Sequence, residues 1–269
     1  MRRFESVLIA ILICAWQMPT FAKQSQEAYD TRWLPITEME IKKRVRANAN
    51  DATTLYSLWW RAVYQQQKTA YFKALYDLKQ KKPNGEVLGT YCQVLLDSRA
   101  NYGRPPLAIA NKDFALENVR LLLNQAKRKR PRLWINYTAE AEIALYEDTA
   151  NHAAKRFAFA QRAQHLAPSV SYANNCLGYA YVNVARSNKG YDKKYLNEAI
   201  FYYKRAQKLT PTDVGASFLL LHIYNAYAPN VAEARKTRQA ILATIPPGTK
   251  LNAKCRGILA RYKISYKGK

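Results

Sequence analysis

The sequence predicts an all-α fold, an α-solenoid in which helical hairpins stack side by side. Three observations lead to this prediction. From about Ile36 onward, apolar residues recur at steps of three and four, and the alternation typical of strands is absent. Glycines and prolines fall mostly at the ends of these segments, where helices end. An alanine stands five residues before Pro131, Pro168 and Pro211, and these prolines, with Pro246, are 37, 43 and 35 residues apart.

The first segment, residues 1–22, is predicted to be an export signal. A positively charged start precedes a continuous apolar run from Val7 to Trp16, and small residues end the segment at Ala22. The apolar run is shorter than the roughly 20 residues needed to span a bilayer. We therefore expect cleavage near Ala22, export to the periplasm or the cell exterior, and no transmembrane span in the mature form.

The next two segments are predicted to begin the helical stack. Residues 23–49 hold a polar lead-in and a first helix, and residues 50–131 hold degenerate hairpins. The helices expected in these hairpins run through 51–62, 70–78, 88–96 and 114–126. The breaks between them contain Asn, Gly and Pro, which favour turns.

Residues 132–249 carry the strongest repeat signal, and its best unit spans 174–211. Leu177-Gly178 lies in the first helix of this unit, Tyr203 and Ala206 lie in the second, and Pro211 ends it. A residue as small as Gly178 lets two helices approach closely, and Tyr203 would fill the space beside it. The long interval of 43 residues comes from a polar loop at 186–194, which interrupts the repeat.

This order of residues resembles the tetratricopeptide repeat (TPR), which has a period of about 34 residues. The resemblance continues at 140–168, where Arg156 stands in place of an alanine, and at 217–246, and it weakens upstream of these segments. It implies a right-handed α-solenoid of about five TPR-like hairpins. Residues 250–269 are expected to form a basic capping helix and tail.

The resemblance also implies a concave groove, lined by the first helix of each hairpin, that binds a protein or peptide. The residues implied as the partner-binding groove are Tyr172, Asn175, Tyr179, Asn183, Phe218, His222 and Asn225. Further residues implied on the same face are Glu142, Asp148, Tyr56, Trp60 and Tyr64. Tyrosine offers rigid contact area and asparagine can hydrogen-bond a peptide backbone. The first hypothesis is therefore a non-enzymatic exported scaffold.

The charge supports a second hypothesis, a basic adaptor for an anionic cell-envelope polymer or lipid. The formal net charge is +24 and the pI is about 9.9. The longest basic run supplies the candidates for an anionic surface, Lys127, Arg128, Lys129, Arg130 and Arg132. The same run ends a predicted helix, where cations also complement the helix dipole. Export argues against a specific nucleic acid as the natural partner.

No motif for catalysis, a cofactor or a metal is found. The three histidines have no partner at metal-ligand spacing, and the sequence lacks Cys-x-x-Cys, Gly-x-Ser-x-Gly and a Gly-rich phosphate loop. A lytic enzyme with one catalytic glutamate would have to use Glu86, Glu140 or Glu198, but no motif surrounds them. We expect no catalytic residue and no cofactor.

Three cysteines, Cys92, Cys176 and Cys255, remain after signal cleavage. An odd number leaves at least one thiol unpaired or paired between chains. Cys92 and Cys176 lie beside apolar residues in helical patterns, which favours small buried side chains over a disulfide framework.

Overall fold

The computed structural model describes residues 33–147, 151–187, 190–212 and 214–266, so the predicted signal at 1–22 lies outside the described residues. The helices of this part are α3 (Glu38–Ala47), α4 (Ala52–Tyr64), α5 (Lys68–Lys81), α6 (Gly85–Tyr102), η1 (Ala108–Ala110), α7 (Asn111–Phe114), α8 (Leu116–Lys129), α9 (Trp134–Ile143), η2 (Ala144–Tyr146), α10 (His152–Leu166), α11 (Ser171–Ala185), α12 (Lys193–Leu209), α13 (Val214–His222), the π-helix η3 (Ile223–Tyr227), α14 (Val231–Ala243) and α15 (Ala253–Arg261).

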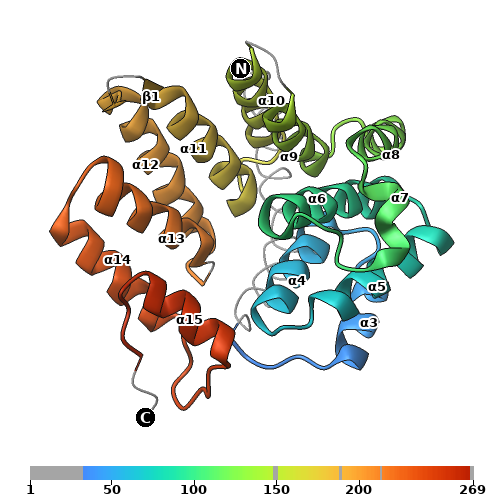
Figure 1. Cartoon of the computed structure of the whole chain (residues 1–269), viewed down its shortest axis with the longest axis horizontal. Helices are drawn as coiled ribbons and strands as arrows, with labels where there is room; N and C mark the ends of the chain where they lie inside the picture. Colours follow the sequence, from blue (N-terminus) through green and yellow to red (C-terminus); the bar gives the residue numbers. More distant parts are fainter. Residues whose placement is uncertain (1–32, 148–150, 188–189, 213, 267–269) are drawn as a thin grey trace, which may run out of the picture.

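Within the described residues the helices pair into five hairpins. Figure 1 shows how the helices follow one another around the molecule. The pairs are α4 with α5, α6 with α8, α9 with α10, α11 with α12, and α13 with α14. Helix α3 precedes them and packs on α5, and α15 follows them as the predicted last helix. The prediction of an all-α solenoid of about five hairpins is confirmed.

Several helices begin where the sequence places short polar side chains. Asp51 Oδ1 accepts hydrogen bonds from the backbone N–H groups of Thr53 and Thr54, at 3.0 and 3.1 Å. Asn84, Asn230 and Asn252 each accept a hydrogen bond from the N–H three residues further on, at the starts of α6, α14 and α15. Such caps satisfy donors that the first helical turn leaves unpaired. Asn84, which lies in the break between the helices predicted at 70–78 and 88–96, is therefore a helix start.

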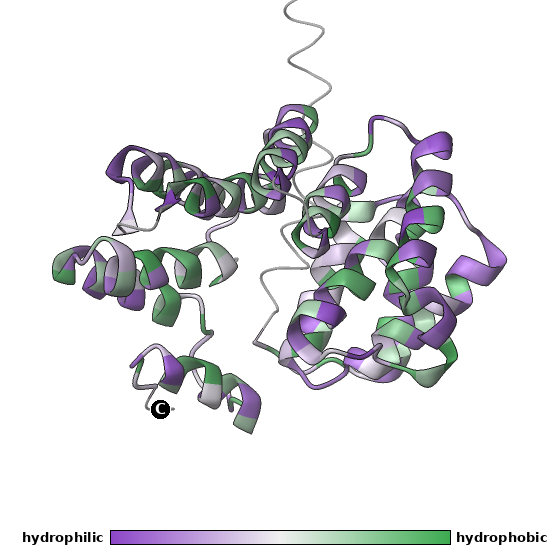
Figure 2. Ribbon diagram, turned by 45° about the horizontal axis from the view of Figure 1, so that its top comes forward, coloured by the Kyte–Doolittle hydropathy of each residue, from purple (hydrophilic) through white to green (hydrophobic). Residues whose placement is uncertain are grey.

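Small residues allow the helices to approach, as predicted. The three alanines of the repeat, Ala126, Ala163 and Ala206, are all fully buried. Gly89 of α6 lies against α9, where an added Cβ would come within 2.9 Å of the Ile135 side chain. Figure 2 shows hydrophobic residues gathered where helices face one another and hydrophilic residues on the outside.

The insert at 186–194, predicted to be a polar loop, contains a short antiparallel hairpin among its described residues. Strand β1 (Arg186–Ser187) pairs with β2 (Gly190–Tyr191). The Tyr191 ring stacks on Tyr227 of η3, with ring centroids 4.1 Å apart. The insert is therefore attached to the next hairpin by an aromatic contact.

The stack curves until its two ends meet, so that α15 lies close to the chain that leads into α3 (Figure 1). The Trp33 indole Nε1 donates a hydrogen bond of 2.9 Å to Thr244 Oγ1, and its ring lies edge-on to Tyr64. At the C-terminal end of the stack, Asn252 at the start of α15 donates a hydrogen bond of 3.0 Å from Nδ2 to the Tyr64 carbonyl oxygen of α4. The predicted lead-in therefore carries a buried tryptophan that joins the end of α4 to the end of α14.

The three cysteines of the described chain are buried, free thiols, which confirms the sequence interpretation. Burial raises the pKa of the Cys176 thiol to about 12 and that of Cys255 to about 11, so both are poor nucleophiles.

None of the helices in the described segments combines the length and the apolar character needed to cross a bilayer.

Candidate functional site

The structure exposes only part of the predicted partner groove. Of its seven residues, Tyr179, His222 and Asn225 are exposed, Tyr172 and Asn183 are half-buried, and Asn175 and Phe218 are buried. Phe218 stacks on Tyr262 at 4.5 Å between ring centroids and belongs to the core. Because neighbouring first helices pack closely, their larger side chains fill the space between them. The candidate surface is therefore narrower than the resemblance implies.

The first hairpin shows the same effect. Tyr56 and Tyr64, expected on the concave face, are buried in the core, and Trp60 is half-buried. Tyr172 of α11 reaches across to this hairpin, with its ring centroid 4.4 Å from that of Tyr56. These aromatic residues hold α4 and α11 together. Asp148, expected on the same face, lies outside the described residues.

A buried carboxylate, Asp97 of α6, lies beneath this aromatic cluster. Its Oδ2 accepts hydrogen bonds from Tyr56 OH at 2.7 Å and from Trp59 Nε1 at 3.1 Å. Its Oδ1 accepts from Gln93 Nε2 at 3.1 Å. Burial raises the pKa of Asp97 to about 7, although these three donors lower it. The sequence analysis missed this residue, because an aspartate in an apolar helix pattern does not reveal its partners.

Gln93 extends the Asp97 network to two further helices. Its Nε2 also donates to Tyr172 OH of α11 at 3.2 Å, and its Oε1 accepts from Thr138 Oγ1 of α9 at 3.0 Å. The network thus joins α4, α6, α9 and α11, which are the first helices of four successive hairpins. A satisfied polar network of this kind fixes the register of packed helices.

Three tyrosines on successive first helices remain accessible, and we call Tyr102, Tyr146 and Tyr179 the tyrosine row. They belong to α6, to η2, which continues α9, and to α11. Tyr146 is 37% exposed, Tyr179 is 40% exposed, and Tyr102 is half-buried. A cation lies over each ring: Lys68 at 3.5 Å from the Tyr102 centroid, Arg99 at 5.6 Å from Tyr146, and Arg156 at 4.2 Å from Tyr179.

Electrostatic contacts link the members of the row. The pKa of Tyr146 is raised, mainly by burial and next by the Glu142 carboxylate. The cations Arg99 and Arg156 act in the opposite direction. Burial also raises the pKa of Tyr102, with the Asp97 charge as the second cause. Asp97 therefore acts on both Tyr102 and Tyr146, and Arg156 acts on Tyr146 and lies over the Tyr179 ring, so neighbouring members of the row share a charged residue. Sequence reasoning found Tyr179 alone; the position of Tyr102 and Tyr146 at the ends of first helices was the available signal.

Arg156 supports the exposed Tyr179 from below. The sequence marked Arg156 as a departure from the repeat pattern, and the structure shows it only 1% exposed. Its Nη2 pairs with Glu142 Oε1 at 3.2 Å, while its Nε and Nη1 are buried without hydrogen-bond partners among the described residues. The Asn175 Oδ1 oxygen is also buried without such a partner. A cation beneath an aromatic ring holds that ring in place.

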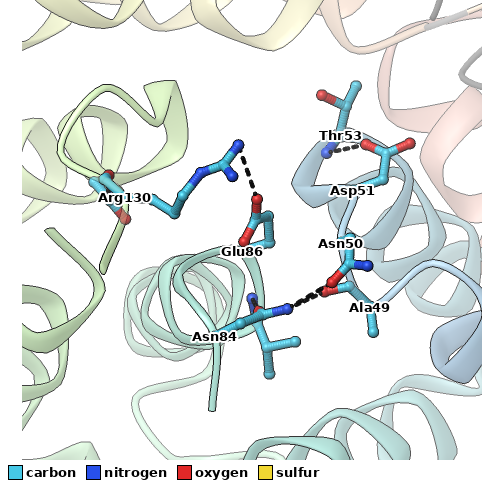
Figure 3. Close-up of polar contacts among 9 residues, drawn as sticks. Ala49, Asn50, Asp51, Thr53, Asn84, Glu86 and Arg130 are labelled. Carbon is cyan, nitrogen blue, oxygen red and sulfur yellow. Dashed lines mark hydrogen bonds and ion pairs between the residues drawn. The ribbon is translucent and has the colours of Figure 1, made fainter. Parts of the chain in front are cut away.

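The basic run at 127–132, predicted to bind an anionic surface, contains both paired and unpaired cations. Lys127 Nζ pairs with Glu140 at 2.5 Å, and Arg130 pairs with Glu86 at 3.2 Å. Figure 3 shows the Arg130–Glu86 pair reaching over the start of α6, beside the Asn84 contacts to Ala49 and Asn50. The other members, Arg128, Lys129 and Arg132, are exposed and have no ion pair within the described segments.

An open pocket of about 520 Å³ lies at this edge. Its described lining is Asn50, Lys82, Asn84, Gly85, Glu86, Lys129 and Arg130. Lys82, Lys129 and Arg130 make it basic, but Glu86 already pairs with one of these cations (Figure 3). Glu86 and Glu140, considered above as catalytic candidates, are therefore held in ion pairs. No cluster of three or more metal-ligating residues occurs in the described parts of the chain.

The comparisons with known proteins concern the fold. No protein-family model matches the chain, and no curated protein matches it. Among solved structures, the chain is similar to a thermophilic TPR protein of Thermus thermophilus, at 16% sequence identity and a TM-score of 0.43. The similarity covers 68% of this chain and 86% of that chain. The helix pairing itself establishes the all-α solenoid of five hairpins in the described chain.

Proposed function

We propose that the chain is a non-enzymatic exported scaffold that binds a protein or peptide partner across the first helices of its hairpins. The observation that carries the proposal is the tyrosine row. Accessible tyrosines on three successive helices, each with a cation over its ring, offer large and rigid contact area. Tyrosine and arginine are also the residue types most enriched among the dominant contacts of protein interfaces.

The geometry favours a partner that lies across the helices. Tyr102, Tyr146 and Tyr179 come from successive first helices, so a segment that contacts all three must cross the stack. Tyr179 is supported by Arg156, and little conformational freedom is lost when its ring is covered. An extended or helical peptide meets this requirement.

The test begins with cross-linking in the native envelope to capture the partner, followed by affinity measurements on the purified pair. We expect Tyr146→Ala and Tyr179→Ala each to weaken binding more than tenfold, because they remove central aromatic contacts. Phe201→Ala is the matched control, since Phe201 is an exposed aromatic residue on a second helix. Equal affinities for wild type and both tyrosine variants would contradict the proposal.

The export part of the proposal rests on the sequence of residues 1–22 alone. Its check is the N-terminal sequence of the protein recovered from the envelope fraction or the medium. A start at Lys23 is expected. A recovered chain that still begins at Met1 would exclude cleavage at Ala22.

A second candidate function is attachment to an anionic envelope polymer or lipid. It is favoured by the exposed, unpaired Arg128, Lys129 and Arg132 at one edge. Binding by this edge should fall steeply between about 50 and 200 mM salt, because screening lengths shorten over that range. The double variant Arg128→Gln/Lys129→Gln should weaken it further, and binding to the tyrosine row should survive both changes.

A further inference from the structure

An open pocket of about 550 Å³ lies where the last hairpin meets α15. Its described lining is His222 of α13, Asn225 of η3, Arg238 of α14, and Arg261, Tyr262 and Lys263 at the end of α15. These residues are brought together from four elements by packing of the C-terminal helices. The pocket belongs to the hairpin that follows Tyr179, and its lining includes His222 and Asn225 of the predicted partner groove.

The lining carries positive charge that the protein itself does not neutralise. Arg238, Arg261 and Lys263 have no ion pair to a carboxylate among the described residues, and no carboxylate is found in the described lining. On the neighbouring surface of α12 and α14, Lys204 and Lys236 both pair with Glu233. Three unpaired cations facing one pocket repel each other unless an anion joins them.

The hydrogen bonds in the pocket leave mainly donors available. Arg238 Nε donates to the Tyr262 carbonyl oxygen and its Nη2 donates to Asn225 Oδ1, each at 3.2 Å. These bonds fix the Arg238 guanidinium and occupy the Asn225 side-chain oxygen. Arg238 Nη1 and the Asn225 amide N–H groups remain available to donate hydrogen bonds to a ligand. His222 Nε2 lies 2.7 Å from Tyr227 OH, and the other ring nitrogen, Nδ1, can donate when Nε2 accepts from this hydroxyl. A ligand rich in acceptor oxygens complements this set.

Lys263 supplies independent support from the backbone. It adopts a left-handed conformation with φ of 57°, directly after α15. Its N–H bonds to the Ala260 carbonyl oxygen at 2.9 Å, and the Ile264 N–H bonds to that of Leu259 at 3.0 Å. This arrangement is a Schellman motif, in which glycine is usual because other residues are strained there. A lysine therefore stands where the fold alone would favour glycine, and it is one of the residues that line the pocket.

We propose that this pocket binds a phosphate group. A phosphoryl group carries about −1.5 to −2 charge near pH 7 and offers several acceptor oxygens, which matches three cations and the remaining donors. A single carboxylate would neutralise less of the charge and satisfy fewer donors. The π-helix η3, which places Asn225 and follows His222, is a distortion often found at functional sites. The inference does not depend on the proposed protein partner.

The test is calorimetric titration of the full mature chain with inorganic phosphate at about 50 mM salt. We expect binding at one site, weakening as salt rises, and at least tenfold weaker binding of acetate. Lys263→Gly should weaken phosphate binding about tenfold or more, since it removes a charge-assisted contact, while the fold is preserved or stabilised. Arg238→Gln should also weaken it.

Two control variants separate the loss of the pocket's Lys263 side chain from the effect of a glycine at a left-handed position and from the effect of removing one positive charge. Gln66→Gly is the backbone control, because Gln66 has φ of 60° at the equivalent position after α4. Lys208→Gln is the charge control, an exposed lysine on α12. Both should bind phosphate as wild type does. Absence of binding by wild type, or equal loss in Lys208→Gln and Lys263→Gly, would overturn the proposal, as would equal affinity for acetate and phosphate.

Vesicles identify the source of the phosphate group. Vesicles containing phosphatidic acid should bind wild type, fail to bind Lys263→Gly, and be displaced by inorganic phosphate if the group belongs to a lipid. Phosphate binding without vesicle binding indicates a free or soluble phosphate compound. If the Lys263→Gly variant still binds the vesicles, the lipid binds the general basic surface instead of the pocket. The phosphate titration by calorimetry would then be the test of the pocket.

Discussion

The aromatic ring of Tyr203 on α12 lies directly against the backbone of Gly178 on α11. A Cβ added at Gly178 would come within 2.7 Å of Tyr203 Cε1 and 2.8 Å of Cδ1, closer than packed atoms allow. Tyr203 is 1% exposed, so the ring cannot move into solvent. The absence of a side chain at Gly178 therefore sets how closely the two helices of this hairpin pack.

The first prediction concerns this contact. Gly178→Ala should lower the free energy of unfolding by about 1–3 kcal/mol, because overpacking outweighs the better helix propensity of alanine. Gly257→Ala is the matched control: Gly257 is also helical, and an added Cβ there meets nothing within 4 Å. It should raise stability by about 0.5–1 kcal/mol. Urea unfolding measures both, and a stabilised Gly178→Ala variant would contradict the packing argument.

The second prediction concerns the Tyr203 hydroxyl, which is buried with no hydrogen-bond partner among the described residues. Tyr203→Phe removes a polar group that the fold leaves unsatisfied, so the free energy of unfolding should stay equal or increase by about 1 kcal/mol. Tyr71→Phe is the control, because Tyr71 OH donates to the Leu55 carbonyl oxygen at 2.6 Å. That change should destabilise the protein. Equal losses in the two variants would indicate an unseen partner for Tyr203.

The third prediction concerns pH. The pKa of Asp97 is raised to about 7 by burial, so between about pH 4 and pH 7 the unfolded chain loses a proton that the folded chain keeps. Stability is therefore expected to fall as pH rises through this window, by about 3 kcal/mol between pH 5 and pH 8. Asp97→Asn should flatten this dependence. Urea unfolding at the two pH values measures it, and a steeper slope in the variant would exclude Asp97 as the cause.

The fourth prediction concerns closure of the stack. Trp33→Ala should lower stability by about 3–5 kcal/mol, because a buried tryptophan and its bond to Thr244 are lost. Spin labels introduced at Lys43 and Ala260 should show a broader distance distribution in this variant, since the ends are no longer held. Met39→Ala, at a residue 80% exposed, should change neither measurement. An unchanged distance distribution in Trp33→Ala would mean that other contacts close the stack.

The helices and their pairing could be predicted because they depend on local patterns. The three- and four-residue periodicity, the polar caps and the alanine-to-proline spacing each act within one hairpin, and the structure confirms the hairpins they predict. The close contact of Gly178 with Tyr203 was also predictable, because both residues lie in one repeat. The candidate groove was predicted less well, because exposure of Tyr172 or Phe218 depends on neighbouring hairpins.

By itself, the sequence determined the all-α class, the five hairpins, the buried thiols and the excess of positive charge. The tertiary structure alone decided which residues meet across distant segments: Trp33 with Thr244, Asp97 with Tyr56, and Tyr262 with Arg238. The physical reason is that helix formation depends on residues a few positions apart. Curvature, burial and the gathering of charges depend on how small differences in packing accumulate over many helices.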